Sequence, residues 1–136
     1  MRVVLDRSVL VAAFRSPGGV SGEVVRRCRG GRARLVLTTP LLLEYEAVAG
    51  RAEHLAAADA TPEDLGRFLD AVCAFGDAVT PTWLWRPQLR DPDDEMVLEA
   101  AVCGRAHIVT FNVRDFGPAT QFGVRVLEPR DALREF

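Results

Sequence analysis

The hydrophobic positions of this chain alternate between short unbroken runs and longer stretches with helical spacing. Short apolar runs bounded by turns are typical of parallel strands that are buried on both faces. They predict strands at residues 2–5, 34–38, 106–110 and 124–127, and a short one at 78–80. The intervening stretches predict helices at residues 8–14, 22–28, 40–50, 62–75, 94–103 and 129–136.

The helix expected at 62–75 has the clearest signals. Thr61 suits the N-cap, Pro62 suits the first helical position, and two acids fill the first turn. Gly76 ends the pattern. The spacing of one apolar stripe predicts a face that packs on the core, made of Leu65, Phe68, Leu69, Val72 and Cys73.

Strands that alternate with helices indicate an α/β protein with a covered parallel sheet. We expect a three-layer sandwich with a central, mainly parallel sheet of four or five strands flanked by helices. The 136 residues contain no repeat or low-complexity linker, so residues 1–136 are predicted to form a single domain.

The chain carries no signal for a membrane or for export. No stretch approaches the ~18–20 apolar residues of a membrane span. Asp6 and Arg7 interrupt the apolar start, which favours a strand over a signal peptide. Cys28, Cys73 and Cys103 are odd in number and far apart, as expected for reduced thiols. We therefore expect a cytoplasmic protein.

The basic residues are all arginines, although the net charge is −2. Two readings of the cluster between positions 26 and 34 remain open, a solvated helix end or a patch that grips phosphates. The second reading makes some of these side chains candidates for RNA binding: Arg26, Arg27 and Arg29. Trp83 and Trp85 could stack on bases, but packing under a proline-rich loop is the preferred interpretation.

Four acidic residues are predicted to meet at one edge of the sheet. Asp6 directly follows the first strand, and Asp115 lies just past the strand at 106–110. Glu44 falls in the second turn of the helix after the second strand, and Asp94 opens the helix that leads into the third. Helices that follow parallel strands start at the carboxyl edge, where open α/β sheets bind ligands.

Each of these acids has a structural explanation of its own, because Asp94 could be a helix cap and Asp115 a loop acid. Their joint placement is what indicates a site. Carboxylates held close together repel one another and raise each other's pKa, and a divalent cation removes that penalty. Oxygen ligands alone favour Mg²⁺ or Mn²⁺ over zinc.

Four segments in order resemble motifs of the PIN domain family, and specifically its toxin branch in bacterial toxin–antitoxin pairs, the VapC-like ribonucleases. The first, at 3–14, is VVLDRSVLVAAF, and the second, at 38–48, is TTPLLLEYEAV. The third, at 91–101, is DPDDEMVLEAA and is the most specific, and the last, at 108–116, is IVTFNVRDF. The similarity extends over nearly the whole chain.

The resemblance implies a metal-dependent endoribonuclease that hydrolyses single-stranded RNA and leaves a 5′-phosphate and a 3′-hydroxyl. One or two Mg²⁺ or Mn²⁺ ions, often weakly held, would be bound by Asp6, Asp94, Asp115 and Glu44. Support for the ligands or their waters would come from Ser8, Thr110 and Asn112. The implied partners are the RNA substrate, a small antitoxin protein and a second copy of the chain in a homodimer.

One departure from the family pattern leads to an alternative function. Arg7 follows the first acid, where the family usually has threonine or another small residue. If its cation pairs with the carboxylates in place of a metal, the protein is a catalytically weak or silent module that binds RNA or antitoxin. A nuclease acting on DNA also stays open. A phosphoacceptor or phosphatase built on Asp6 is disfavoured because the chain contains no lysine.

Overall fold

The computed structural model describes residues 1–81 and 87–136, and its centre is a five-stranded sheet with every pairing parallel. The strand order is β3-β2-β1-β4-β5. Val3 lies opposite Leu35 on one side and His107 on the other. The strands are β1 (Arg2–Leu5), β2 (Arg34–Leu37), β3 (Asp77–Ala78), β4 (His107–Val109) and β5 (Val126–Leu127). The predicted parallel sheet is therefore confirmed.

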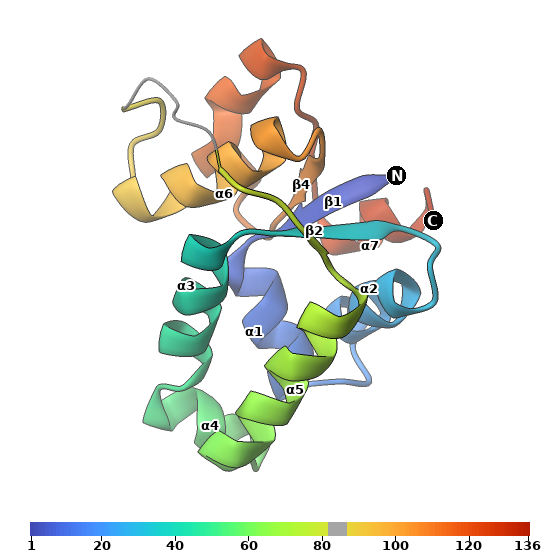
Figure 1. Ribbon diagram of the computed structural model, residues 1–136, viewed down its shortest axis with the longest axis vertical. Coiled ribbons are helices and arrows are strands. Elements are labelled where there is room, and N and C mark those ends of the chain that lie inside the picture. Colours follow the sequence, from blue (N-terminus) through green and yellow to red (C-terminus); the bar gives the residue numbers. More distant parts are fainter. Residues whose placement is uncertain (82–86) are drawn as a thin grey trace.

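Helices cover both faces of this sheet. Figure 1 shows α6 and the 3-10 helix η1 above the strands, with α1, α3, α4 and α5 below them. The helices are α1 (Arg7–Arg15), α2 (Val20–Arg29), α3 (Thr39–Ala49), α4 (Ala52–Ala58), α5 (Pro62–Phe75), α6 (Pro92–Cys103), η1 (Val113–Phe122) and α7 (Pro129–Leu133). The predicted three-layer arrangement is confirmed.

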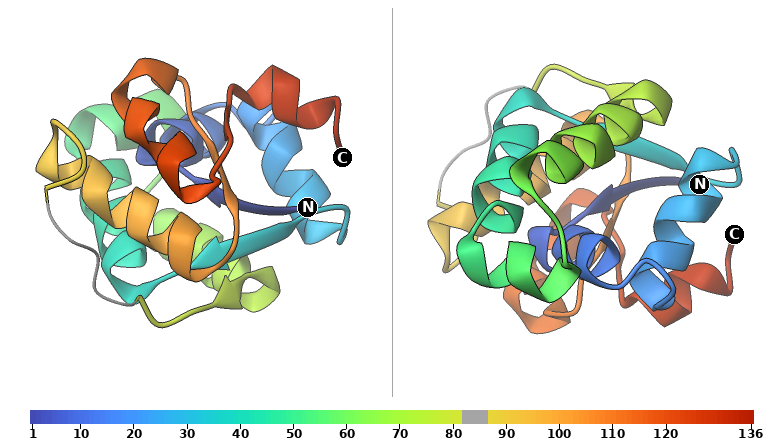
Figure 2. Two further views of the ribbon diagram at one scale, coloured as in Figure 1. Left: turned by 90° about the horizontal axis from the view of Figure 1, so that it is seen from above. Right: turned by 90° about the horizontal axis from the view of Figure 1, so that it is seen from below.

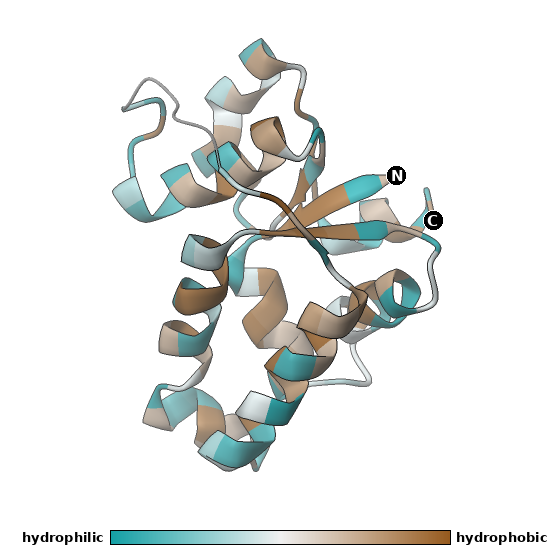
Figure 3. Cartoon of the chain, viewed as in Figure 1, coloured by the Kyte–Doolittle hydropathy of each residue, from teal (hydrophilic) through white to brown (hydrophobic). Residues whose placement is uncertain are grey.

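The core lies on the two faces of the inner strands, which Figure 3 shows as the most hydrophobic part of the chain. Val3, Val4 and Leu5 of β1 have no exposed surface. Tyr45 of α3 is also fully buried, and its hydroxyl donates a hydrogen bond to the carbonyl of Leu5. Burial raises the pKa of Tyr45 well above its usual value, so this donor stays protonated. The bond fixes α3 against the end of β1.

The sequence signals of α5 are confirmed with one exception. Thr61 and Asp64 form a reciprocal capping box at its start. The predicted stripe is buried at Leu65, Leu69 and Val72. Cys73, however, is exposed and was wrongly assigned to the core, because the buried face of α5 is narrower than the apolar stripe. None of the three cysteines, all of which lie in the described residues, is joined in a disulfide.

Two helices have no counterpart in the prediction, and α2 and α6 each start two residues earlier than expected. The unexpected ones are α4 and η1. Helix α6 begins at Pro92 and not at Asp94, because the carboxylate of Asp91 accepts a hydrogen bond from the Asp93 backbone at 2.9 Å and caps the first turn. Asp94 therefore lies inside the first turn of the helix and is not its cap.

The arginine cluster on α2 is largely engaged within the protein. Arg26 and Arg27 both form ion pairs with Glu23, and Arg27 also donates to the Leu133 carbonyl at 2.9 Å. These bonds tie α2 to α7, which lies beside it near both chain termini (Figure 2). The RNA-binding role of Arg26, Arg27 and Arg29 stays a prediction.

Two further expectations concern tryptophans and membranes. Trp83 and Trp85 lie outside the described residues. Across the part of the chain that the structure describes, no helix has the length and apolar character needed to cross a bilayer.

Candidate functional site

Asp6 is positioned at the carboxyl end of β1 by bonds from two neighbouring segments. Its backbone N–H donates to the Val109 carbonyl at 2.9 Å, which extends the pairing of β1 with β4 by one bond. Its Oδ2 accepts from the Ser8 hydroxyl at 2.9 Å and from the Thr110 hydroxyl at 2.7 Å. Its Oδ1 is buried and has no hydrogen-bond partner among the described residues. One oxygen of this carboxylate is thus held, and the other is left to accept a ligand.

Thr110 links this carboxylate to the segment that follows β4. Its hydroxyl oxygen also accepts a hydrogen bond from the Asn112 backbone at 3.0 Å. The Asn112 carbonyl in turn accepts from the Asp115 backbone at 3.0 Å, where η1 begins. Asn112 and Asp115 are exposed at the mouth of the site. The predicted supporting roles of Ser8 and Thr110 therefore have direct contacts to Asp6, whereas Asn112 makes its contact through its backbone.

The variant Thr110→Val tests this support. It keeps the shape of the side chain but removes the donor to Asp6 and the acceptor for the Asn112 backbone, so we expect a loss of about 1–3 kcal/mol in the free energy of unfolding. Chemical denaturation monitored by circular dichroism measures it. The control Thr120→Val removes only an exposed hydroxyl bonded to the Gly117 carbonyl and should change stability by less than about 0.5 kcal/mol. Equal effects in both variants would contradict the role given to Thr110.

Asp94 is the second buried acid of the site, with 4% of its surface exposed. Burial in the first turn of α6, together with the nearby charges of Asp6, Asp91 and Asp115, raises its pKa to about 6, although Arg7 opposes the shift. The raised pKa means that Arg7 does not fully compensate the negative charge of ionised Asp94. The charges of Asp6 and Asp115 both raise the pKa of Asp94, which is consistent with the predicted proximity of the three acids.

Arg7 points its guanidinium into this group of acids. Its Nη1 lies 3.8 Å from Glu44 Oε1 and 3.8 Å from Asp94 Oδ1, and its Nη2 lies 3.6 Å from Asp91 Oδ2. These separations are too long for hydrogen bonds, and Nη1 is buried with no hydrogen-bond partner in the described part of the chain. Arg7 therefore contacts these acids through charge and not through hydrogen bonds, and it lies beside two members of the predicted acidic cluster, Glu44 and Asp94.

The chemistry of these residues suits a divalent ion, but their arrangement leaves no ready cage for one. The unpartnered oxygen of Asp6 and the uncompensated charge of Asp94 are hard oxygen donors of the kind that Mg²⁺ and Mn²⁺ take. Among the residues that the structure describes, however, no three acids are close enough to hold one ion together. Glu44 and Asp94 are instead arranged around Arg7.

Two acids of the same segment have contacts that the sequence did not reveal. Asp91 pairs with Arg7 as well as capping α6. Glu95 is buried, and its Oε1 accepts from the backbones of Gln88 and Leu89 at 2.6 and 2.9 Å. Glu95 thereby anchors the chain that leads into the site. The Asp-Pro pair at the start of the helix was a sequence signal for Asp91, whereas no sequence signal pointed to Glu95.

The comparisons with known proteins agree with this architecture. A family model of the PIN domain matches residues 2–114. No curated protein matches the sequence. Among solved structures, VapBC-1 from nontypeable Haemophilus influenzae is similar with a TM-score of 0.63 and 16% identity, over 96% of this chain and 99% of that chain.

Two other solved structures share the fold. VapBC2 from Rickettsia felis, bound to a DNA fragment from its promoter, has a TM-score of 0.61 and 11% identity over 94% of this chain and 98% of that one. A domain of a functionally unknown protein from Methanocaldococcus jannaschii has a TM-score of 0.53 and 17% identity, over 93% and 89% of the two chains. Together with the match over residues 2–114, this shows that the chain belongs to the PIN domain family.

Proposed function

We propose that the protein is a metal-dependent endoribonuclease that hydrolyses single-stranded RNA. The observation that carries the proposal is a pair of buried acids at the carboxyl edge of the sheet. One is Asp6, with a buried and unpartnered Oδ1, and the other is Asp94, whose pKa is raised to about 6. Burying two carboxylates costs stability unless a cation compensates them. Two buried acids at this edge therefore indicate that their negative charge is needed for function.

Mg²⁺ or Mn²⁺ is the proposed cofactor. Asp6, Asp94 and Asp115 would hold it by moving closer together than they lie here, with Glu44 as a further ligand or as the group that orients a water. When bound, the ion would polarise the scissile phosphate and lower the pKa of an attacking water. Ser8 and Thr110 keep one oxygen of Asp6 engaged, so that only the other is available. Arg7 balances the acids in the absence of the ion.

The proposed biological role is the toxin component of a toxin–antitoxin pair. Its support is the PIN domain match together with the likeness in fold to VapBC-1 and VapBC2. The proposed partners are a small antitoxin protein and a second copy of this chain. Co-expression with the neighbouring small open reading frame should yield a complex whose mass is measured by light scattering.

The test of the nuclease proposal uses the purified protein and a labelled pool of single-stranded RNA. We expect cleavage with Mn²⁺ and none with EDTA, because without the ion nothing polarises the phosphate or lowers the pKa of the attacking water. The products should carry a 5′-phosphate that a terminal exonuclease accepts. Calorimetry should show Mn²⁺ binding in the same buffer. An equal amount of heat-denatured protein controls for contaminating ribonuclease. Cleavage that persists in EDTA would overturn metal dependence.

A second function is favoured by one specific observation, the ion pairs of Arg7 with Glu44, Asp91 and Asp94. In that case Arg7 permanently fills the acidic site, and the protein is a silent module that binds RNA or antitoxin. Calorimetry separates the two functions, because the silent module binds no Mn²⁺ and cleaves no RNA under the same conditions.

A further inference from the structure

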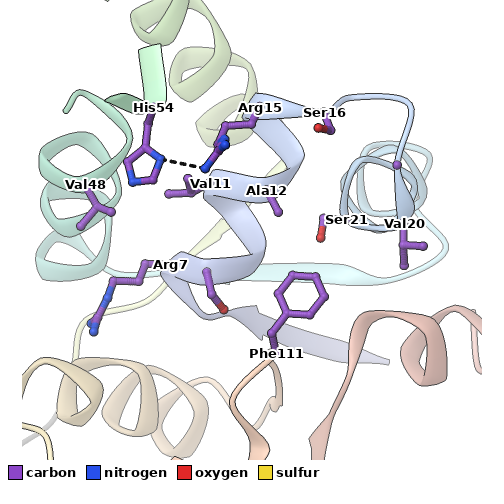
Figure 4. Close-up of a pocket in the computed structure, with 12 residues that line it drawn as sticks. Arg7, Val11, Ala12, Arg15, Ser16, Val20, Ser21, Val48, His54 and Phe111 are labelled. Atoms are coloured by element: carbon purple, nitrogen blue, oxygen red, sulfur yellow. Dashed lines mark hydrogen bonds between the residues drawn. The ribbon is translucent and has the colours of Figure 1, made fainter. Parts of the chain in front are cut away.

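A cleft of about 620 Å³ opens beside the acidic site and follows the exposed face of α1 (Figure 4). Its lining starts at Arg7 and Ser8, directly after Asp6, and extends through Ala12 to Arg15. Positions three and four apart share a helix face, so these side chains form one continuous wall. Ser8 and Arg15 are about 10 Å apart along the helix axis, a span on the scale of one or two nucleotides. The cleft therefore leads away from the acidic site.

The charged side chains along this cleft are all basic. Of the described residues that line it, the charged or titratable ones are Arg7, Arg15 and His54, and none is acidic. Arg15 is exposed, and its Nη1 lies 3.4 Å from Nδ1 of His54, as the dashed line in Figure 4 shows. Glu53 approaches His54 at 3.9 Å, but it lies outside the lining and is 73% exposed. The charge of the cleft thus complements a polyanion.

The rest of the lining is uncharged, with serines beside apolar residues, and it includes a large exposed ring. Phe111 is 48% exposed and lies at the opposite end of the cleft from Arg15 (Figure 4). It follows Thr110, whose hydroxyl bonds to Asp6, so the ring is fixed next to the acidic site. Val20 is also 47% exposed on the wall formed by α2. Aromatic rings exposed in a basic groove are the usual platforms on which single-stranded bases stack.

We propose that this cleft holds the single-stranded RNA next to the bond that is cut, with a base stacked on Phe111 and a phosphate contacted by Arg15. The inference rests on the proposed nuclease function and adds the path of the substrate. An apolar peptide in the cleft would bury Arg15 and His54 without a partner for their charge, which is unfavourable. A nucleic acid strand supplies a base that can stack on Phe111 and a phosphate that can pair with Arg15.

Binding of a fluorescein-labelled oligouridylate to the full chain in EDTA tests this path, because no cleavage is needed for the signal. We expect Phe111→Ala to weaken binding about tenfold through the lost stacking. Arg15→Gln should weaken binding and reduce the slope of log affinity against log salt by about 0.7, the value for one lost phosphate contact on a single strand. The matched controls Phe122→Ala and Arg130→Gln, both outside the cleft, should bind like the parent protein.

The outcomes separate this inference from the nuclease proposal. Parent-like binding by both Phe111→Ala and Arg15→Gln, with cleavage intact, would overturn the RNA path and leave the nuclease standing. If both variants lose RNA binding and the parent protein does not cleave RNA with Mn²⁺, the results would support RNA binding in the cleft and overturn the nuclease. No measurable binding by the parent protein would also overturn the path. Thermal melting of each variant confirms that the fold is retained.

Discussion

Replacing Asp94 with asparagine is expected to abolish RNA cleavage and, at the same time, to stabilise the metal-free protein. The loss of activity should reach roughly 10²–10³-fold, the size seen when one charge-stabilising group is removed from an active site. The stability gain follows from the pKa of Asp94, which is raised from 3.8 to about 6 in the folded protein. Above that pH the native state carries a buried charge that asparagine does not have.

The raised pKa of Asp94 determines how its effect on the free energy of unfolding depends on pH. Because the folded pKa lies above the unfolded one, the contribution of Asp94 to stability is fully present below about 3.8 and is lost as the pH rises through about 6. Asp94→Asn should therefore unfold with a free energy about 1–3 kcal/mol higher than the parent at pH about 7.5. The difference should shrink toward zero, or reverse, near pH about 4.

Denaturant unfolding in EDTA at the two pH values measures this difference. The matched control is Asp93→Asn, which changes an exposed acid in the same helical turn and leaves its backbone bond to Asp91 in place. It should show neither the stability gain nor the loss of cleavage. If Asp94→Asn is less stable than the parent at neutral pH, the charge of Asp94 is compensated, and the argument for a metal-seeking site fails.

The sequence was sufficient to predict the sheet and the edge at which the acids gather. Unbroken apolar runs gave the positions of β1, β2 and β4, and the βα connections then placed Asp6 and Asp94 at the carboxyl edge. Both positions depend on periodicity and chain direction, which are local properties. The burial of both acids follows from the same topology, because α6 packs against β1.

The direction of Arg7 could not be predicted in this way. Its side chain is fixed by Glu44 on α3 and by Asp91 before α6, which are far away in the sequence. The exposure of Phe111, on which its proposed stacking role depends, was missed for a similar reason. A hydrophobic residue after a strand predicts burial, whereas the ring is 48% exposed.

The two unpredicted helices lacked the usual local signals. Helix α4 is only seven residues long, and just Leu55 and Ala58 pack partly against the core, so its apolar stripe is too short to detect. The 3-10 helix η1 includes Pro118 and a change of backbone direction at Phe116, and it ends at Gly123 with a φ of 73°. Proline and glycine at such spacing predict a loop. Neither helix therefore has a pattern of hydrophobic residues long and regular enough to be recognised in the sequence.

Replacing Arg7 with methionine should show whether its guanidinium is a removable counter-ion or a permanent occupant of the site. Methionine replaces the aliphatic part of the side chain but removes the cation that balances Glu44, Asp91 and Asp94. We expect the metal-free variant to lose about 1–2 kcal/mol of stability, between the values for exposed and buried ion pairs. Mn²⁺ should bind about tenfold more tightly, because no internal cation competes for the carboxylates.

Calorimetry and denaturation in EDTA measure the two effects, with Arg134→Met as the control for an exposed ion pair. Mn²⁺ binding by both parent and Arg7→Met, with cleavage retained, identifies Arg7 as a counter-ion that the metal displaces. Binding by the variant alone would identify the parent as a silent module. A variant that binds Mn²⁺ but has lost cleavage would place Arg7 on the substrate phosphate. Unchanged metal affinity would contradict the competition inferred from its distances of 3.6–3.8 Å to the three acids.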